Sequence, residues 1–579
     1  MGIKFFYKWL SQNFGQHIKH INAGKSDVAI DVLLVDMNGL FHNSAQRVFK
    51  YGNCAQKSLL RKIEHVKFNN KTQLACFEDV AKSIERLVTV VHPTTTLVFA
   101  VDGVAPASKI NQQRQRRFRG SLESTLTAVD RFDSISITPG TKFMDQLSKY
   151  IDWYIRKRMT ESDLWRNLKV VFSSEKCPGE GEHKLVDYIR KYGRDDATYC
   201  INALDADLVM LSLATMKPNF YLLRDEQNKG SSKSEFSLVS IGGLRTELQK
   251  SVMFWEGSNP KLLIKDFILV CFLCGNDFLP NIPSISIIEN SLDVIIKVYK
   301  QVCGDARSHL VDDANCIHLR IFQQFLHSIG TREQGILVQK AINKNDCFPN
   351  PMLEEHTNTT ILNIIERSDG VSDGETSTEQ LIVDVDMVGY KEAYYNKKGL
   401  SDIRAVCHSY ISGCQWVLTY YLAGVKDWSW VYPYNYSPFA LEIADHVSSY
   451  TPTKIVSTRP ISPFEQLLCV VPPKSANLLP SPLGALLKSG KFKPFCPDTF
   501  VINCEGKKYE YEGVVELPIA DISFVKRECN VLMSRIDLED AKRNDVGQTL
   551  VYTNGEFRTN VRSCYGEIRN CDVETMVLV

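Results

Sequence analysis

The chain has 579 residues, too many for one ordinary hydrophobic core, so we expect more than one domain. Hydrophobic residues make up 44% and charged residues 23%, which excludes a disordered or fibrous protein. The formal net charge is +1, so any nucleic-acid partner has to be bound by a local basic patch.

No segment has the length of a membrane span. The longest apolar run, Phe267 to Cys274, is far shorter than the roughly 20 residues required. The N-terminal stretch contains Lys4 and Lys8, which is untypical of a signal peptide. The 17 Cys are odd in number and lack a disulfide-framework spacing. We therefore expect a cytoplasmic protein, with the nucleus as the alternative, and no membrane partner.

Four apolar runs in the first 280 residues each precede an acidic residue. They are residues 32–35, 97–101, 170–172 and 201–204. Segments with helical spacing lie between them, for example 77–90 and 145–158, so the pattern predicts an α/β fold with a parallel sheet flanked by helices. Ligands of such sheets bind at the carboxyl ends of the strands, where these acids stand.

The composition changes after residue 353. Residues 354–386 hold nine acids and one Arg, which predicts a flexible surface linker over 354–387. Residues 388–579 are rich in Tyr, Trp and Pro and form a predicted second region packed on the first. The predicted division is a catalytic domain over 1–353, the acidic linker, and the second region over 388–579.

Seven carboxylates stand in Gly-rich or turn-like contexts and form the candidate site. They are Asp36, Asp102, Glu180, Glu182, Asp205, Asp207 and Asp277. Burying seven acids at one sheet edge is prohibitively costly without cations, and their oxygen ligands suit Mg²⁺ or Mn²⁺. Two such ions about 3.5–4 Å apart are the usual arrangement for phosphodiester hydrolysis.

Each acid also has a simpler interpretation. A single Asp is more often a helix cap or a surface turn, so the metal hypothesis depends on the whole set. Cys271 and Cys274 lie in an apolar helix without a second pair, which favours core packing over zinc. His183 follows Glu182. It is either a residue that hydrogen-bonds to a metal ligand and orients it, or a structural His.

A basic segment follows Asp102. Residues 107–119, ASKINQQRQRRFR, contain no acid, and on a helix they bring Lys109, Gln113, Arg116 and Arg117 to one face. This face is either a phosphate pocket beside the metals or a solvated basic surface, and its closeness to Asp102 favours the pocket.

Long motifs, in order along the chain, resemble the Xrn family of 5′→3′ exoribonucleases. They are VDMNGLFHN, FAVDGVAPASKINQQRQRRFR, CPGEGEHKLVDYIR, LDADLVML, GNDFLP and GCQWVLTYYLAGVKDWSWVYPYNYSPF. The resemblance implies a PIN/flap-nuclease-like core, a second conserved region that closes the active-site pocket, and metal binding by the same seven acids. It also implies a 5′-phosphate pocket at the basic face and bases stacked between His42 and a Trp, for which Trp428 and Trp430 both remain candidates.

The expected activity is processive hydrolysis of single-stranded RNA with a 5′-monophosphate to nucleoside 5′-monophosphates. The expected cofactor is Mg²⁺, as two ions that Mn²⁺ can replace, and the expected biological role is RNA and mRNA decay by a monomer. Two alternatives are a flap-type DNA endonuclease and a non-catalytic RNA-binding scaffold. Ala107 and Tyr511 depart from the usual family residues, which puts fine substrate handling in question rather than catalysis.

Overall fold

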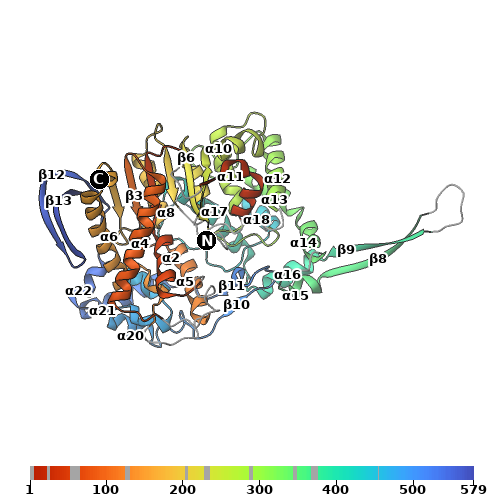
Figure 1. Cartoon of the computed structure of the whole chain (residues 1–579). Coiled ribbons are helices and arrows are strands. Elements are labelled where there is room, and N and C mark those ends of the chain that lie inside the picture. Colours follow the sequence, from red (N-terminus) through yellow and green to blue (C-terminus); the bar gives the residue numbers. More distant parts are fainter. Residues whose placement is uncertain are drawn as a thin grey trace.

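A computed structural model describes ten segments of the chain. They are residues 6–21, 27–52, 66–123, 131–202, 207–226, 235–285, 291–342, 348–366, 376–453 and 455–578. Within these segments a nine-stranded sheet runs through the body in the order β1-β7-β6-β5-β2-β3-β4-β12-β13 (Figure 1). Its strands are β1 (Ile18–Ile21), β2 (Val32–Asp36), β3 (Thr96–Ala100), β4 (Lys169–Ser173), β5 (Tyr199–Asn202), β6 (Phe220–Glu226), β7 (Glu235–Ser240), β12 (Leu550–Ser563) and β13 (Gly566–Val577).

The centre of the sheet is parallel. Strands β6, β5, β2, β3 and β4 pair in parallel, whereas β7 and β1 at one edge and β12 and β13 at the other pair antiparallel. All four strands expected from the sequence belong to the parallel part. The predicted fold class, a mixed and mainly parallel sheet flanked by helices, is confirmed.

Successive residues of β2 point to opposite sides of the sheet, and each side has its own core. Leu33 and Val35 pack with one set of helices, and Val32 and Leu34 with the other. The first set is α2 (Met37–Phe49), α4 (Asn70–Val91) and α6 (Lys142–Glu161). The second set includes α8 (Gly181–Tyr192), α9 (Asp207–Ala214), α11 (Pro260–Phe272) and α17 (Ile403–Ala423). Because both faces are covered, the central strands are apolar throughout, as the sequence pattern indicated.

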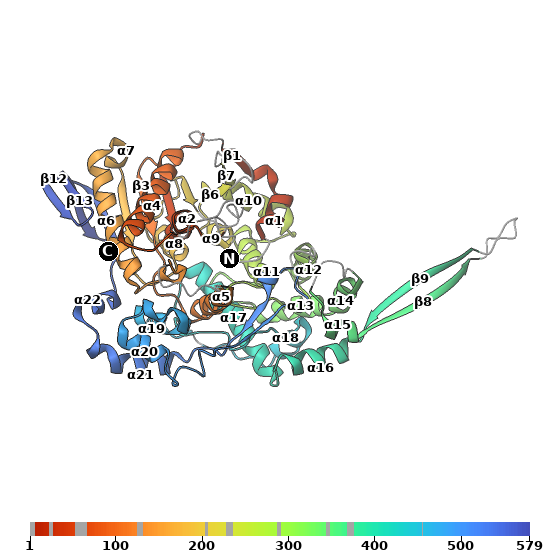
Figure 2. The same ribbon diagram turned by 60° about the horizontal axis from the view of Figure 1, so that its bottom comes forward.

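The second region shares cores with the first. Helix α17 packs in the same buried cluster as α9 and α11, and β12 pairs with β4 to extend the central sheet. A third cluster joins α5 (Ala107–Glu123) to α19 (Pro463–Val470), α20 (Ser481–Leu487) and α21 (Ile522–Leu532), a group seen beside α5 in Figure 2. The change of composition at residue 388 therefore does not separate two independent cores.

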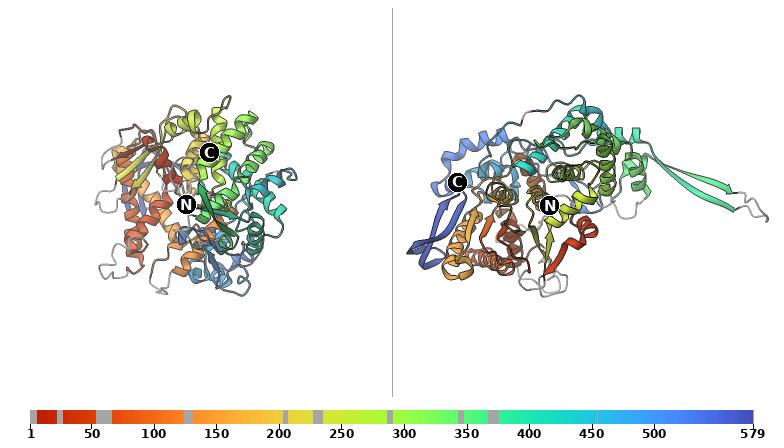
Figure 3. Two further views of the ribbon diagram at one scale, coloured as in Figure 1. Left: turned by 90° about the vertical axis from the view of Figure 1, so that its right-hand side faces the viewer. Right: turned by 90° about the horizontal axis from the view of Figure 1, so that it is seen from above.

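The acidic segment differs from the flexible linker predicted over 354–387. Strands β8 (Thr357–Glu366) and β9 (Thr376–Val385) pair as an antiparallel ribbon that projects from the body (Figures 1 and 3). The runs TTILNII and EQLIVDV are rich in β-branched residues, which favour strands and outweigh the acidic composition. Residues 367–375, between the two strands, lie outside the described part.

The remaining helices and strands complete the body. They are α1 (Phe6–Asn13), α7 (Asp163–Arg166), α10 (Ile241–Glu247), α12 (Ser291–Ala306), α13 (Leu319–Gly330), α14 (Glu333–Ile342), α15 (Pro351–Glu355), α16 (Met387–Lys397), α18 (Ala440–Val447), α22 (Leu538–Ala541), β10 (Val501–Asn503) and β11 (Val514–Glu516). Among the described helices, none combines the length and the apolar character needed to cross a membrane.

Candidate active site

Asp36 and Asp102 meet at the carboxyl ends of two neighbouring strands. Asp36 ends β2 and caps α2 by accepting the Asn38 N–H at 3.3 Å. Asp102 follows the adjacent parallel strand β3. Asn38 joins the two positions, because its Nδ2 donates to Asp102 Oδ2 at 2.7 Å and its Oδ1 accepts the Asp102 N–H at 3.0 Å. The parallel sheet thus brings together two acids that are 66 residues apart in sequence.

The start of helix α8 closes on the same two acids. The N–H of Gly181 donates to Asp102 Oδ1 at 2.7 Å. A Cβ atom at position 181 would lie 2.8 Å from Asp36 Oδ1 and 3.3 Å from Asp102 Oδ1, so both carboxylates approach one point. Only glycine fits there without displacing an acid. The positive end of the α8 dipole also favours carboxylates at this place.

Lys109 connects helix α5 to three further acids. Its Nζ lies 2.5 Å from Glu180 Oε2, 2.8 Å from Asp277 Oδ2 and 3.9 Å from Glu182 Oε1. Burial alone would lower the pKa of Lys109, but these carboxylates, Asp277 first, raise it well above its usual value. For Asp277, burial opposes ionisation while the Lys109 ammonium prevails and holds its pKa below the usual range. Lys109 is therefore a fixed cation within the acidic group.

Six of the seven predicted acids are described, and they converge on this end of the sheet. Asp207 begins α9, is 2% exposed, and acts electrostatically on Lys109. Asp205 lies outside the described residues. Glu180 is 3% exposed, and burial raises the pKa of its carboxyl although Lys109 lowers it. The site therefore holds an excess of negative charge that is largely withdrawn from water.

This donor set fits a hard cation by its chemistry. Its ligands are carboxylate oxygens, which Mg²⁺ prefers, and the Lys109 ammonium offsets only part of their charge. In the described part of the chain, no three acidic, His or Cys side chains close around one point as metal ligands do. Glu180 and Asp277 instead meet at Lys109 Nζ, so a bound metal would compete with that ammonium.

The predicted phosphate-binding face is only partly assembled. Lys109 is engaged by the acids, and Gln113 is buried and accepts a hydrogen bond from Gln466 Nε2 at 3.5 Å. Arg116 is exposed and lowers the pKa of Asp277. Arg117 has a buried Nη1 without a hydrogen-bond partner among the described residues.

Arg117 has a charge and, in the described part of the chain, a free donor that a bound anion would satisfy. Burial, followed by the neighbouring Arg116, lowers the pKa of Arg117 to about 9, while Asp133 and Asp102 act in the opposite direction. A guanidinium stays protonated at neutral pH, so the lowered pKa marks a cation that lacks sufficient counter-charge. An anion at Nη1 would supply both the missing charge and the missing acceptor.

The candidate stacking residues are in different environments. His42 lies on α2 one turn after Asn38 and is half-buried. Trp430 stacks on Trp416, with ring centroids 4.9 Å apart, and its ring abuts Gly413. The carbonyl of Trp428 accepts the N–H of Ala107 at 2.9 Å, at the start of α5. Packing on the buried Trp416 therefore accounts for Trp430, and Trp428 is the better candidate for stacking.

Three residues near the acids were not identified from the sequence. They are Asn38, Lys184 and Tyr420. Asn38 follows Asp36 by two residues, and its amide could have been suspected as a turn residue. The Lys184 Nζ donates to the carbonyls of Val101 at 2.7 Å and Ser174 at 2.9 Å, which secures the chain just before Asp102. Tyr420 belongs to an aromatic run that, in sequence, looks like ordinary core.

Tyr420 and His183 form one buried unit. Their rings are parallel with centroids 3.6 Å apart, and the Tyr420 hydroxyl donates to Glu180 Oε1 at 2.9 Å. Burial, with a contribution from Arg190, lowers the pKa of His183 well below its usual value. A neutral His183 therefore supports Tyr420 through ring contact.

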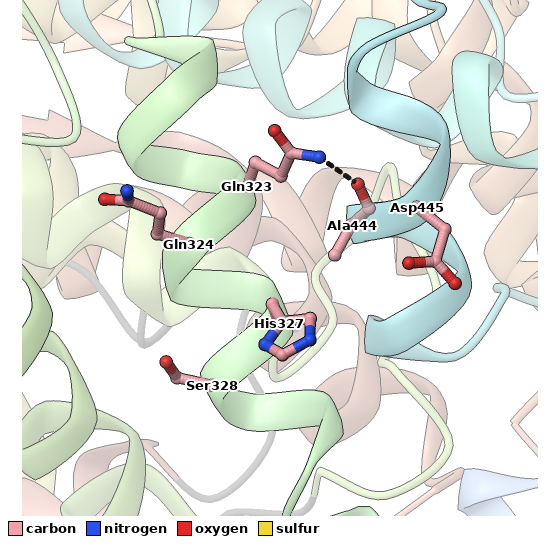
Figure 4. Close-up of a pocket in the computed structure, with 6 residues that line it drawn as sticks. All are labelled: Gln323, Gln324, His327, Ser328, Ala444 and Asp445. Carbon is pink, nitrogen blue, oxygen red and sulfur yellow. Dashed lines mark hydrogen bonds between the residues drawn. The ribbon is translucent and has the colours of Figure 1, made fainter.

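A surface pocket of about 320 Å³ lies between α13 and α18, away from the predicted site residues. It is lined by Gln323, Gln324, His327, Ser328, Ala444 and Asp445 (Figure 4). Gln323 Nε2 donates to the Ala444 carbonyl at 2.9 Å across the pocket wall. None of the predicted site residues lines this pocket.

Comparison with known proteins agrees with this geometry. The family model described as "XRN 5'-3' exonuclease N-terminus" matches residues 1–226, and the "Xrn1 helical domain" model matches residues 259–368 and 350–577. The 5'-3' exoribonuclease 2 homolog of Drosophila melanogaster is 28% identical over 96% of this chain and 74% of its own length. The 5'-3' exoribonuclease 2 of Gallus gallus is 28% identical over 95% of this chain and 72% of its own.

A longer relative matches equally well. The 5'-3' exoribonuclease 1 of Homo sapiens is 28% identical over 95% of this chain and 35% of its own length. The two family models together account for most of the chain, including all the acids gathered at the sheet edge. The chain therefore belongs to the XRN 5′-3′ exonuclease family.

Proposed function

We propose that this protein is a Mg²⁺-dependent 5′→3′ exoribonuclease that processively hydrolyses single-stranded RNA bearing a 5′-monophosphate and releases nucleoside 5′-monophosphates. The observation that carries the proposal is the buried Nη1 of Arg117, which has no acceptor in the described part of the chain, next to a buried group of carboxylates. An anion site beside a cation site is what cleavage near a phosphorylated end requires.

The acids are the proposed ligands of two Mg²⁺ ions, for which Mn²⁺ can substitute. The ligands are Asp36, Asp102, Glu180, Glu182, Asp205, Asp207 and Asp277. When bound, the ions lower the pKa of water and stabilise charge on the leaving oxygen. The chain itself supplies orientation: Asn38 and the Gly181 N–H fix Asp102, and Lys109 holds Glu180 beside Asp277.

The 5′-monophosphate is the proposed ligand of Arg117, with Arg116, Gln113 and Lys109 as further contacts. A dianion offers Arg117 charge-assisted hydrogen bonds, and a hydroxyl end offers none. Lys109 meets Glu180 and Asp277 directly, so we propose that its ammonium contacts the phosphate once a metal ion engages those acids. A triphosphate has the right charge but too much volume for a closed pocket.

His42 and Trp428 are the proposed stacking platform for the first bases. Stacking on aromatic rings tolerates any base, which suits an enzyme that degrades RNA without regard to sequence. The Trp428 carbonyl accepts the N–H of Ala107, so the backbone of Trp428 lies beside the start of the helix that carries Arg117. We propose a monomer that acts in RNA decay. Its described cysteines are free thiols, which suits the cytoplasm or the nucleus.

The test uses 3′-labelled RNAs that are identical except for a 5′-monophosphate, triphosphate or hydroxyl, each with Mg²⁺ or with EDTA. The proposal expects rapid decay of the monophosphate RNA alone, in Mg²⁺ alone. A branched DNA flap serves as the competing substrate. Cleavage of the flap with intact RNA would indicate a structure-specific DNA endonuclease, and RNA binding without cleavage would indicate a scaffold.

A further inference from the structure

Both carboxylate oxygens of Glu180 are held by other side chains. Oε2 meets Lys109 Nζ at 2.5 Å, and Oε1 accepts the Tyr420 hydroxyl at 2.9 Å. Lys109 lies on α5. Tyr420 lies on α17 and is 240 residues from Glu180 in the sequence. The orientation of Glu180 therefore depends on a residue of the second region.

Tyr420 is itself fixed in place. Its ring lies flat on His183, at 3.6 Å between centroids, and packs against Trp416 at 5.2 Å and Phe278 at 5.6 Å. The residue is 2% exposed, and its hydroxyl is the donor in the bond to Glu180 Oε1. A donor with so little freedom selects one rotation of the Glu180 carboxylate.

We infer that Tyr420 is a positioning residue for metal binding: its hydroxyl holds Glu180 Oε1 so that Oε2, now against Lys109, is presented to the cation. This inference deepens the proposed function and rests on it. Residues that hydrogen-bond to metal ligands and so orient them typically raise the affinity for the metal about 10–100-fold. Tyr420 also gives the second region a direct role in the acidic site, beyond covering it.

The test compares Tyr420→Phe with Tyr394→Phe. Tyr394 on α16 is also buried, and its hydroxyl donates to the Ser437 carbonyl at 2.9 Å instead of to a site acid. Each variant keeps its ring and loses one hydroxyl, so both should fold. Calorimetric titration with Mn²⁺ should give a dissociation constant about 10-fold or more above wild type for Tyr420→Phe and an unchanged one for Tyr394→Phe.

Two readouts separate positioning from general damage. The unfolding temperature without metal should be similar for the two variants. The Mg²⁺ concentration for half-maximal hydrolysis should rise in Tyr420→Phe, and saturating Mg²⁺ should restore most of the rate. In a Glu180→Gln background, adding Tyr420→Phe should change Mn²⁺ affinity less than twofold, because the hydroxyl acts through Glu180.

Failure of this inference is distinguishable from failure of the proposed function. If wild type binds Mn²⁺ and degrades RNA while Tyr420→Phe has wild-type metal affinity, only the inference is overturned. An equal loss in Tyr394→Phe, or a full additional loss in the Glu180→Gln background, also overturns it. If wild type neither binds Mn²⁺ nor degrades RNA, the proposed function and this inference fall together.

Discussion

Replacing Arg117 with Met should remove most of the preference for a 5′-monophosphate over a 5′-hydroxyl. The buried Nη1 has no acceptor among the described residues, and burial with Arg116 lowers the pKa of this guanidinium to about 9. One hydrogen bond between charged groups contributes about 1.5–3 kcal/mol. Since 1.4 kcal/mol is tenfold, the ratio of kcat/KM for the two ends should fall about 10- to 150-fold. The hydroxyl substrate should be cleaved at nearly the wild-type rate.

The matched control is Arg119→Met on the same helix. Its guanidinium donates to the carbonyls of Tyr511 at 2.9 Å and Glu510 at 2.8 Å, so it is already satisfied by protein. This variant should keep the monophosphate preference within about twofold, a change of less than 0.5 kcal/mol. The assay is kcat/KM for paired RNAs with the two 5′ ends. A full preference in Arg117→Met, or an equal loss in both variants, would refute the reasoning.

Three further perturbations test the site and its surroundings. Gly181→Ala places a Cβ 2.8 Å from Asp36 Oδ1, so it should lower the free energy of unfolding by about 1–3 kcal/mol and slow hydrolysis. In the control Gly120→Ala on α5, the new Cβ meets open space, so the free energy of unfolding should be unchanged or higher by up to about 1 kcal/mol. Denaturant unfolding measures both changes. Trp428→Ala should weaken the binding of single-stranded RNA by about 1–3 kcal/mol and change the free energy of unfolding little. Trp430→Ala removes the ring stacked on Trp416 and should lower the free energy of unfolding by about 3–5 kcal/mol. Lys109→Met removes the cation between Glu180 and Asp277 and should destabilise the metal-free protein by about 3–5 kcal/mol. Thermal unfolding should show Mg²⁺ restoring more stability to that variant than to wild type, and equal stabilisation of both would contradict the assignment.

The central sheet and its acids were predictable because both have local signals. An apolar run of strand length followed by Asp36 or by Asp102 marks a strand end, and parallel pairing brings such ends to one edge. The helical spacing of α4 and α6 was equally visible. These features depend on a few neighbouring residues, so a sequence pattern suffices.

Long-range pairing was not predictable in the same way. Nothing in residues 550–577 indicates that β12 pairs with β4, because an antiparallel strand can join any open edge. The engagement of Lys109 by the acids depends on how α5 lies over the sheet, which the helical face alone does not determine. Tyr420 is one aromatic residue among many, and only the packing of α17 brings its hydroxyl to Glu180.

The ribbon of β8 and β9 lies where the acidic composition predicted a flexible linker. Nine acids in 33 residues favour a solvated linker, yet two strands with many β-branched residues pair in register from Thr357 with Val385 to Glu366 with Thr376. Net charge reports on solvation, and strand formation depends on local alternation and branching. Here the acidic composition and the β-branched residues predicted different structures, and the segment forms the strands that the β-branched residues favour.

The central claim is that the acids at the sheet edge cut RNA from its 5′ end. The most direct measurement follows a uniformly labelled RNA with a 5′-monophosphate in Mg²⁺, with wild type and with Asp102→Asn. The amide variant can keep a hydrogen bond to Asn38 but loses a charge beside Asp36. Wild type should release only nucleoside 5′-monophosphates, and Asp102→Asn should be slower by at least about 100-fold, since metal-assisted charge stabilisation is worth several kcal/mol. Internal fragments from wild type, or equal rates for the two proteins, would contradict the claim.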